Sequence, residues 1–91
     1  MAESFDILQY VKDALGMNGN SFHDVTLIAY IAETKEFMLD AGVSKTVVES
    51  PLSAGIIARG VSDLWNYGSG GTGFSPYFYQ RVTQLCYKKG D

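Results

Sequence analysis

Two serine-proline pairs limit the folds open to this chain, because each marks the start of a helix. Ser50-Pro51 and Ser75-Pro76 both join a hydroxyl N-cap to a proline at the first helical position, where the missing N–H is not needed. Apolar residues recur at helical spacing throughout the chain, and no segment shows the strong alternation of a half-buried strand. The sequence therefore predicts an all-α fold.

About four helices are predicted. The first covers residues 4–15, and the second opens at Ser21, where Asp24 replaces the usual glutamate of a capping box, and ends at Gly42. The third and fourth helices start at the two serine-proline pairs, and residues 44–49 can add one short turn. Because 46% of the residues are hydrophobic, we expect a single packed domain, a small bundle that spans residues 1–91.

Each of the longer helices has a predicted core face. These faces comprise Leu27, Ile28, Ile31 and Met38 in the second helix, Ala54, Ile57, Val61 and Leu64 in the third, and Phe78, Val82, Leu85 and Cys86 in the fourth. Gly60 lies on the core face of the third helix and would allow another helix to approach closely. We expect Trp65 at the junction of the third and fourth helices.

A glycine-rich segment separates the last two helices. It consists of Gly68, Ser69, Gly70, Gly71, Thr72 and Gly73, and its composition predicts a flexible loop. The segment matches the spacing G-x-G-x-x-G, but a dinucleotide-binding fingerprint follows a strand, whereas this segment follows a predicted helix. Phe74 stands where a phosphate-binding P-loop would have its lysine. We therefore expect no nucleotide cofactor.

Side chains that carry catalytic or metal chemistry are scarce. His23 and Cys86 are the only histidine and cysteine, so the sequence predicts neither a metal cluster nor a Cys-His catalytic pair. We expect His23 to be exposed and Cys86 to pack as a small hydrophobe. Arg59 and Asp63 should form an ordinary surface pair. These features indicate a protein that is not an enzyme and has no metal or cofactor.

Charge is unevenly distributed along the chain. Residues 1–49 hold eight acids and three bases, a net charge of -5, whereas residues 50–91 hold two acids and four bases, a net charge of +2. Such polarity suits subunits that pack against unlike faces of their neighbours, although an imbalance of this size also arises by chance in a short chain. The acids Glu33, Glu36 and Asp40 share one predicted helix face, which we expect to be solvated.

Four aromatic residues lie away from the predicted core stripes. They are Tyr30 and Phe37 on the second helix, Tyr77 on the fourth, and Tyr87 near the end of the chain. Exposed aromatic side chains are enriched at protein interfaces, so these four are the predicted oligomer or partner interface. Two alternatives remain: they complete a small core, or they stack on single-stranded nucleic acid, which normally requires a basic groove.

Three segments of the chain carry a resemblance to a known family. They are Asp6-Ile7-Leu8-Gln9-Tyr10-Val11-Lys12-Asp13-Ala14-Leu15-Gly16, Glu36-Phe37-Met38-Leu39-Asp40-Ala41-Gly42-Val43 and Ile57-Ala58-Arg59-Gly60-Val61-Ser62-Asp63-Leu64-Trp65-Asn66-Tyr67-Gly68. These segments resemble phage head-to-tail connector proteins, the small adaptors encoded beside capsid genes in long-tailed bacteriophages. The resemblance also includes the glycine-rich segment and Phe78-Tyr79-Gln80-Arg81, and so covers nearly the whole chain. It is a similarity of helix pattern and sequence phrase and contains no chemical signature.

The resemblance implies a structural protein of the virion. Such a protein would form a homo-oligomeric ring, twelvefold in this family, between the portal protein and the next tail-completion protein. Phage DNA would pass through the ring without sequence-specific binding, and no membrane would be involved. We expect the chain to be made and assembled in the cytoplasm of the host bacterium, from a phage or a prophage.

A small DNA-binding helical regulator of phage origin is the alternative function. Four short helices could include a helix-turn-helix. Its predicted third helix, however, has Arg59 as its only cation, whereas a recognition helix must also hold phosphates. The acidic net charge of -3 also disfavours general binding to nucleic acid.

Overall fold

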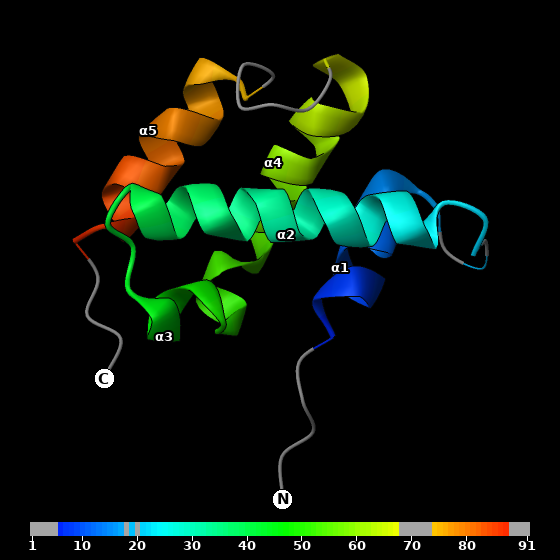
Figure 1. Cartoon of the computed structure of the whole chain (residues 1–91), viewed down its shortest axis with the longest axis horizontal. Helices are drawn as coiled ribbons and strands as arrows, with labels where there is room; N and C mark the ends of the chain where they lie inside the picture. The colour runs from blue at the N-terminus through cyan, green and yellow to red at the C-terminus, as the bar shows by residue number, and fades with distance from the viewer. Residues whose placement is uncertain (1–5, 18, 20, 68–73, 88–91) are drawn as a thin grey trace, which may run out of the picture.

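The computed structural model describes residues 6–17, 19, 21–67 and 74–87, and it confirms the all-α fold (Figure 1). The described part contains no strand. Its elements in chain order are α1 (Ile7–Leu15), α2 (Asp24–Asp40), α3 (Lys45–Val48), the 3-10 turn η1 (Pro51–Ser53), α4 (Ala54–Tyr67) and α5 (Pro76–Leu85). The short α3 is the single turn predicted for residues 44–49. The glycine-rich segment 68–73 lies outside the described residues.

Both serine-proline pairs act as predicted. The Ser75 hydroxyl accepts a hydrogen bond from the backbone N–H of Phe78 at 3.2 Å, and Pro76 is the first residue of α5. The Ser50 hydroxyl likewise accepts from the N–H of Leu52 at 3.2 Å. This second pair opens η1, which continues into α4, so the predicted third helix begins with one 3-10 turn.

The start of α2 differs from the prediction. The helix begins at Asp24 with His23 as its N-cap, and Ser21 contributes only its carbonyl oxygen, which accepts from the N–H of Asp24. The Asp24 carboxylate instead pairs with the Lys12 ammonium at 2.9 Å. Lys12 is buried, so its charge needs this partner. The ion pair that joins α1 to α2 thus replaces the predicted capping box.

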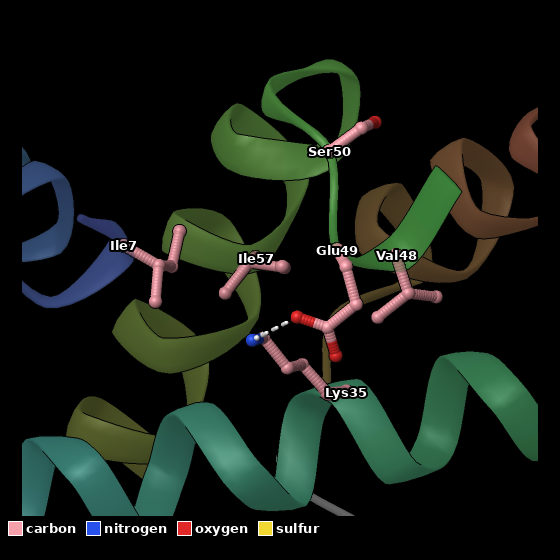
Figure 2. A pocket seen from close by; sticks show the side chains of 6 residues that line it. All are labelled: Ile7, Lys35, Val48, Glu49, Ser50 and Ile57. Carbon is pink, nitrogen blue, oxygen red and sulfur yellow. Dashed lines mark hydrogen bonds and ion pairs between the residues drawn. The ribbon is translucent and has the colours of Figure 1, made fainter. Parts of the chain in front are cut away.

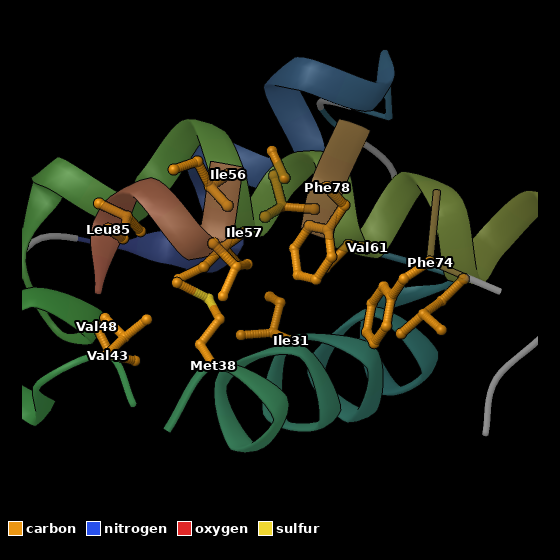
Figure 3. Close-up of a cluster of buried hydrophobic side chains, with 14 of the residues drawn as sticks. Ile31, Met38, Val43, Val48, Ile56, Ile57, Val61, Phe74, Phe78 and Leu85 are labelled. Carbon is orange, nitrogen blue, oxygen red and sulfur yellow. The ribbon is translucent and has the colours of Figure 1, made fainter. Parts of the chain in front are cut away.

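α4 is the central helix of the bundle. It contacts α1, α2 and α5, and α2 passes in front of it in Figure 1. The predicted core residues of α4 are all buried, as are Phe78, Val82 and Leu85 of α5. Figure 3 shows these side chains meeting Ile31 and Met38 of α2 and the valines of the α3 region. One hydrophobic core therefore joins all the helices.

Gly60 allows α2 and α5 to approach α4 closely, as predicted. A Cβ atom at this position would lie 2.7 Å from both Cε1 of Phe78 and Cγ2 of Thr34. Such distances are shorter than van der Waals contact, so any larger residue would have to displace a neighbouring helix.

Two predicted core positions are wrong. Ile28 is 52% exposed, because it lies beyond the edge of the buried stripe of α2, about a sixth of a turn from Ile31. Trp65 does not cover the junction of α4 and α5. Its ring lies 4.9 Å from the His23 ring and 6.3 Å from the Tyr30 ring, against the first half of α2. At the junction of α4 and α5, where we expected Trp65, the Phe74 ring stacks on the Phe78 ring, with 4.4 Å between the ring centres.

Asp63 is also placed differently from the prediction of a surface pair. Only 2% of the residue is exposed. One carboxylate oxygen lies 3.5 Å from Nε of Arg59, and the other accepts a hydrogen bond from the N–H of Ser75 at 2.9 Å. The hydrogen bond to Ser75 holds the beginning of α5 against α4. The four-residue spacing of Arg59 and Asp63 along the chain gave no sign of this second partner.

Candidate protein interface

The four aromatic residues predicted as an interface divide into two classes. Tyr77 and Tyr87 are exposed, as expected. Tyr30 and Phe37 are half-buried and pack against the core, so the expectation that they are exposed is wrong. The Phe37 ring lies 5.1 Å from Phe74, 5.7 Å from Phe78 and 5.4 Å from Tyr79. Phe37 therefore has a packing role within the chain whatever else it contacts.

A surface that sequence reasoning missed lies on the outside of α2. Five apolar residues share this side of the helix: Val25, Ile28, Ala29, Ala32 and Leu39, all exposed. Their spacing places them about 100° to 160° around the helix from Leu27, at the centre of the buried stripe that also holds Ile31, Thr34 and Met38. We call these five residues, together with the exposed acids Glu36 and Asp40, the outer face of α2.

The sequence contained a signal for this face. A helix on the surface of a bundle has one apolar side and one polar side. The apolar positions of α2 extend from its buried stripe over Ile28 and Leu39 to Ala32, Val25 and Ala29, and the prediction counted Ile28 in the core. An apolar arc wider than the core contact indicates a second packing partner, which the described part of this chain does not provide.

A groove runs between α1, α4 and α5. It consists of two adjoining hollows with volumes of about 210 Å³ and about 370 Å³, which share Gly55, Arg59 and Tyr77. The remaining lining residues are Leu52, Ile56 and Arg81 in the first hollow, and Tyr10, Ala14, Leu15, Ala58 and Ser62 in the second. We call this feature the arginine groove.

The arginine groove combines positive charge with an apolar and aromatic lining. The Arg59 guanidinium lies over the Tyr77 ring, with its Cζ atom 5.2 Å from the ring centre, in cation–π geometry. Arg81 donates to the Gln84 side chain at 3.1 Å. The described lining residues include these two arginines and no carboxylate, while the buried Asp63, outside the lining, pairs with Arg59 at 3.5 Å and offsets part of its charge. The groove therefore suits an acidic protein segment with some apolar surface.

A third hollow is much smaller. Its volume is about 30 Å³, and the Lys35–Glu49 ion pair, 3.0 Å long, lies across it (Figure 2). Ile7, Val48, Ser50 and Ile57 complete its lining. A space of this size holds a water molecule or two and no organic ligand. Its contribution is structural, because the ion pair joins α2 to the residue that follows α3.

The single histidine and the single cysteine have local partners. His23 is half-buried between the rings of Phe22, at 5.0 Å, and Trp65, at 4.9 Å, so the expectation that it is exposed is wrong. The Cys86 thiol donates to the carbonyl oxygen of Ala41 at 3.3 Å. Across residues 6–17, 19, 21–67 and 74–87, no three His, Cys, Asp or Glu side chains form a group that could hold a metal ion.

Comparison with known proteins assigns no relative. No family model, curated protein or solved structure matches this chain. None of the helices in the described part is long and apolar enough to cross a membrane.

Proposed function

We propose that this chain is a structural subunit of a phage head-to-tail connector, a virion protein that associates with copies of itself into a ring beneath the portal. The proposal includes the portal protein and the next tail-completion protein as partners, with DNA passing through the ring. The exposed apolar side of α2 is the observation that carries it. The sequence resemblance to head-to-tail connectors supplies the biological setting.

The extent of the outer face of α2 supports an interface. Val25 is 82% exposed, and the apolar row continues through Ile28 and Ala29 to Ala32, about 10 Å further along the helix at 1.5 Å per residue, with Leu39 beyond the exposed Glu36. Single exposed apolar side chains are common on soluble proteins, but a contiguous row marks an interaction site. Association would remove this row from water, which is the main driving force for forming a stable interface.

Sizing across concentration tests the proposal. Light scattering of the full chain, combined with electron microscopy of the largest species, should show assembly into closed rings as the concentration rises. A protein that stays monomeric up to millimolar concentration would contradict self-assembly. Retention of that monomer on DNA at physiological salt would then favour the DNA-binding regulator.

A further inference from the structure

We infer that the ring contact is head-to-tail, with the outer face of α2 of one copy seated in the arginine groove of the next. The inference rests on the proposed self-assembly and adds to it which two surfaces meet. Position, charge and shape each support this pairing.

The two surfaces lie on opposite sides of the molecule. Thr34 of α2 is buried against Gly60 of α4, so this contact lies between the helices. The outer face of α2 is on the far side of α2 from Thr34. Arg59 and Gly55 line the groove on the far side of α4 from the buried Ile57 and Val61. The chain is only 16 Å deep in its shortest dimension, the direction of view in Figure 1, in which α2 passes in front of α4.

The charges of the two surfaces are complementary. The outer face of α2 carries the exposed carboxylates of Glu36 and Asp40 beside its apolar residues. The groove presents Arg59 and Arg81 beside Tyr77 and other apolar groups. Opposite charges at the edge of an apolar contact orient two partners and disfavour the alternative of α2 against α2, which would bring carboxylates together.

The shapes also match. Ala29 and Ala32 occupy the middle of the outer face of α2, and small side chains there allow another surface to come near the helix axis. Gly55 leaves space on the groove side, since a Cβ atom there would meet only the Tyr10 hydroxyl, at 3.7 Å. A helix with small central residues can therefore come close to the shallow depression at Gly55.

A contact between unlike surfaces on opposite sides repeats from copy to copy. Such heterologous contacts build rings when the rotation closes, whereas a contact between like surfaces ends at a dimer. The proposed pairing thus gives a physical route from one exposed helix face to a ring.

Two blocking variants test the pairing. Ala32→Arg places a cation in the middle of the outer face of α2, and Gly55→Glu fills the groove with a carboxylate. Both positions are exposed, and the new carboxylate at position 55 would precede Arg59 by four residues, an arrangement that stabilises a helix. Thr46→Arg and Thr46→Glu, on the exposed side of α3, are matched controls with the same charges outside both surfaces.

Each blocking variant alone should associate about a hundredfold more weakly than the wild type, because Ala32→Arg would bring a third arginine against Arg59 and Arg81, and Gly55→Glu would fill the groove and repel the carboxylates of the outer face of α2. Their equimolar mixture should regain association, beginning with a one-to-one pair, since the groove of the Ala32→Arg chain and the outer face of α2 in the Gly55→Glu chain are both intact. The controls should assemble as the wild type does, and circular dichroism should show equal helicity for all five proteins.

The outcomes separate this inference from the proposed function. If the wild type assembles but Gly55→Glu assembles equally well, or if the mixture fails to form the pair, the head-to-tail pairing is wrong while self-assembly stands. A wild type that never assembles overturns both. Formation of the one-to-one pair by the mixture, with neither variant assembling alone, supports the pairing.

Discussion

The absence of a side chain at Gly60 determines how closely α2 and α5 can pack against α4. Its missing Cβ leaves room for the Phe78 ring and the Thr34 methyl group, which belong to two different helices. Asp63, one helical turn further along α4, fixes the start of α5 through the backbone of Ser75. Both residues act on the arrangement of neighbouring helices.

Gly60→Ala should lower the free energy of unfolding by about 1 to 3 kcal/mol, because the added methyl group overpacks the contact between three helices. This loss would occur although alanine favours a helix. Gly55→Ala in the same helix is the matched control, and with open space at its Cβ it should gain about 0.5 to 1 kcal/mol. Urea unfolding of both variants measures the difference; equal effects would show that Gly60 is not tightly packed.

Asp63→Asn should cost about 1.5 to 3 kcal/mol, because a buried charged acceptor of the Ser75 N–H becomes a weaker neutral one. Arg59→Gln removes the other partner of the same carboxylate, but Arg59 is half exposed, and such pairs contribute about 1 kcal/mol or less. Urea unfolding of the two variants compares these contributions. A larger loss from Arg59→Gln would contradict the role assigned to Ser75.

At the scale of elements, α2 is the helix that differs most from an ordinary surface helix. One side enters the core through Leu27, Ile31 and Met38, and the apolar surface continues around the helix onto exposed residues such as Ile28 and Val25. The other edge of the buried side carries Phe37, whose ring packs against the rings of Phe78 and Tyr79 in α5 and of Phe74, two residues before α5. One side of α2 thus packs in the core, and its exposed apolar residues remain available for association with another chain.

Phe37→Ser and Tyr77→Ser should separate packing from association. Phe37→Ser should lower the free energy of unfolding by about 2 to 4 kcal/mol, since it leaves a cavity among aromatic rings. Tyr77→Ser should change stability by less than about 1 kcal/mol and instead weaken assembly, because the exposed ring lines the arginine groove. Thermal unfolding and light scattering measure the two effects, and a reversal of the pattern would exclude these assignments.

At the scale of the whole molecule, charge and apolar surface have different roles in the proposed ring. Attraction between the carboxylates on the outer face of α2 and the arginines of the groove speeds the encounter of two copies before they touch. The apolar residues stabilise the contact only after it has formed. A thin molecule with unlike surfaces front and back is suited to repeated association in one direction.

Raising the ionic strength from about 50 mM to 500 mM should therefore slow assembly more than it reverses it, because salt screens the steering charges and leaves apolar burial intact. Time-resolved light scattering gives the assembly rate, and sizing at equilibrium gives the extent. Glu36→Gln, with one charge less on the outer face of α2, should show a weaker salt dependence of the rate. Complete dissociation in high salt would mean that charge, and not apolar burial, holds the subunits together.

Local structure in this protein could be predicted from the order of its amino acids alone. The helix start at Ser75-Pro76, the end of α2 at Gly42, the buried stripe of α4 and the close approach at Gly60 all depend on residues near in sequence and on helical periodicity. Such features follow from the backbone chemistry of a few neighbouring residues. They were predictable for that reason.

Which surfaces remain exposed was settled by the packing of the helices against one another. Whether Ile28 or Phe37 meets the core depends on where α4 and α5 cross α2, and periodicity cannot supply that angle. The same applies to Trp65, which packs on α2, and to Asp63, whose partner Ser75 lies twelve residues away. The outer face of α2 and the arginine groove are parts of the helix surfaces that no other helix covers. They could therefore be identified only from the folded chain.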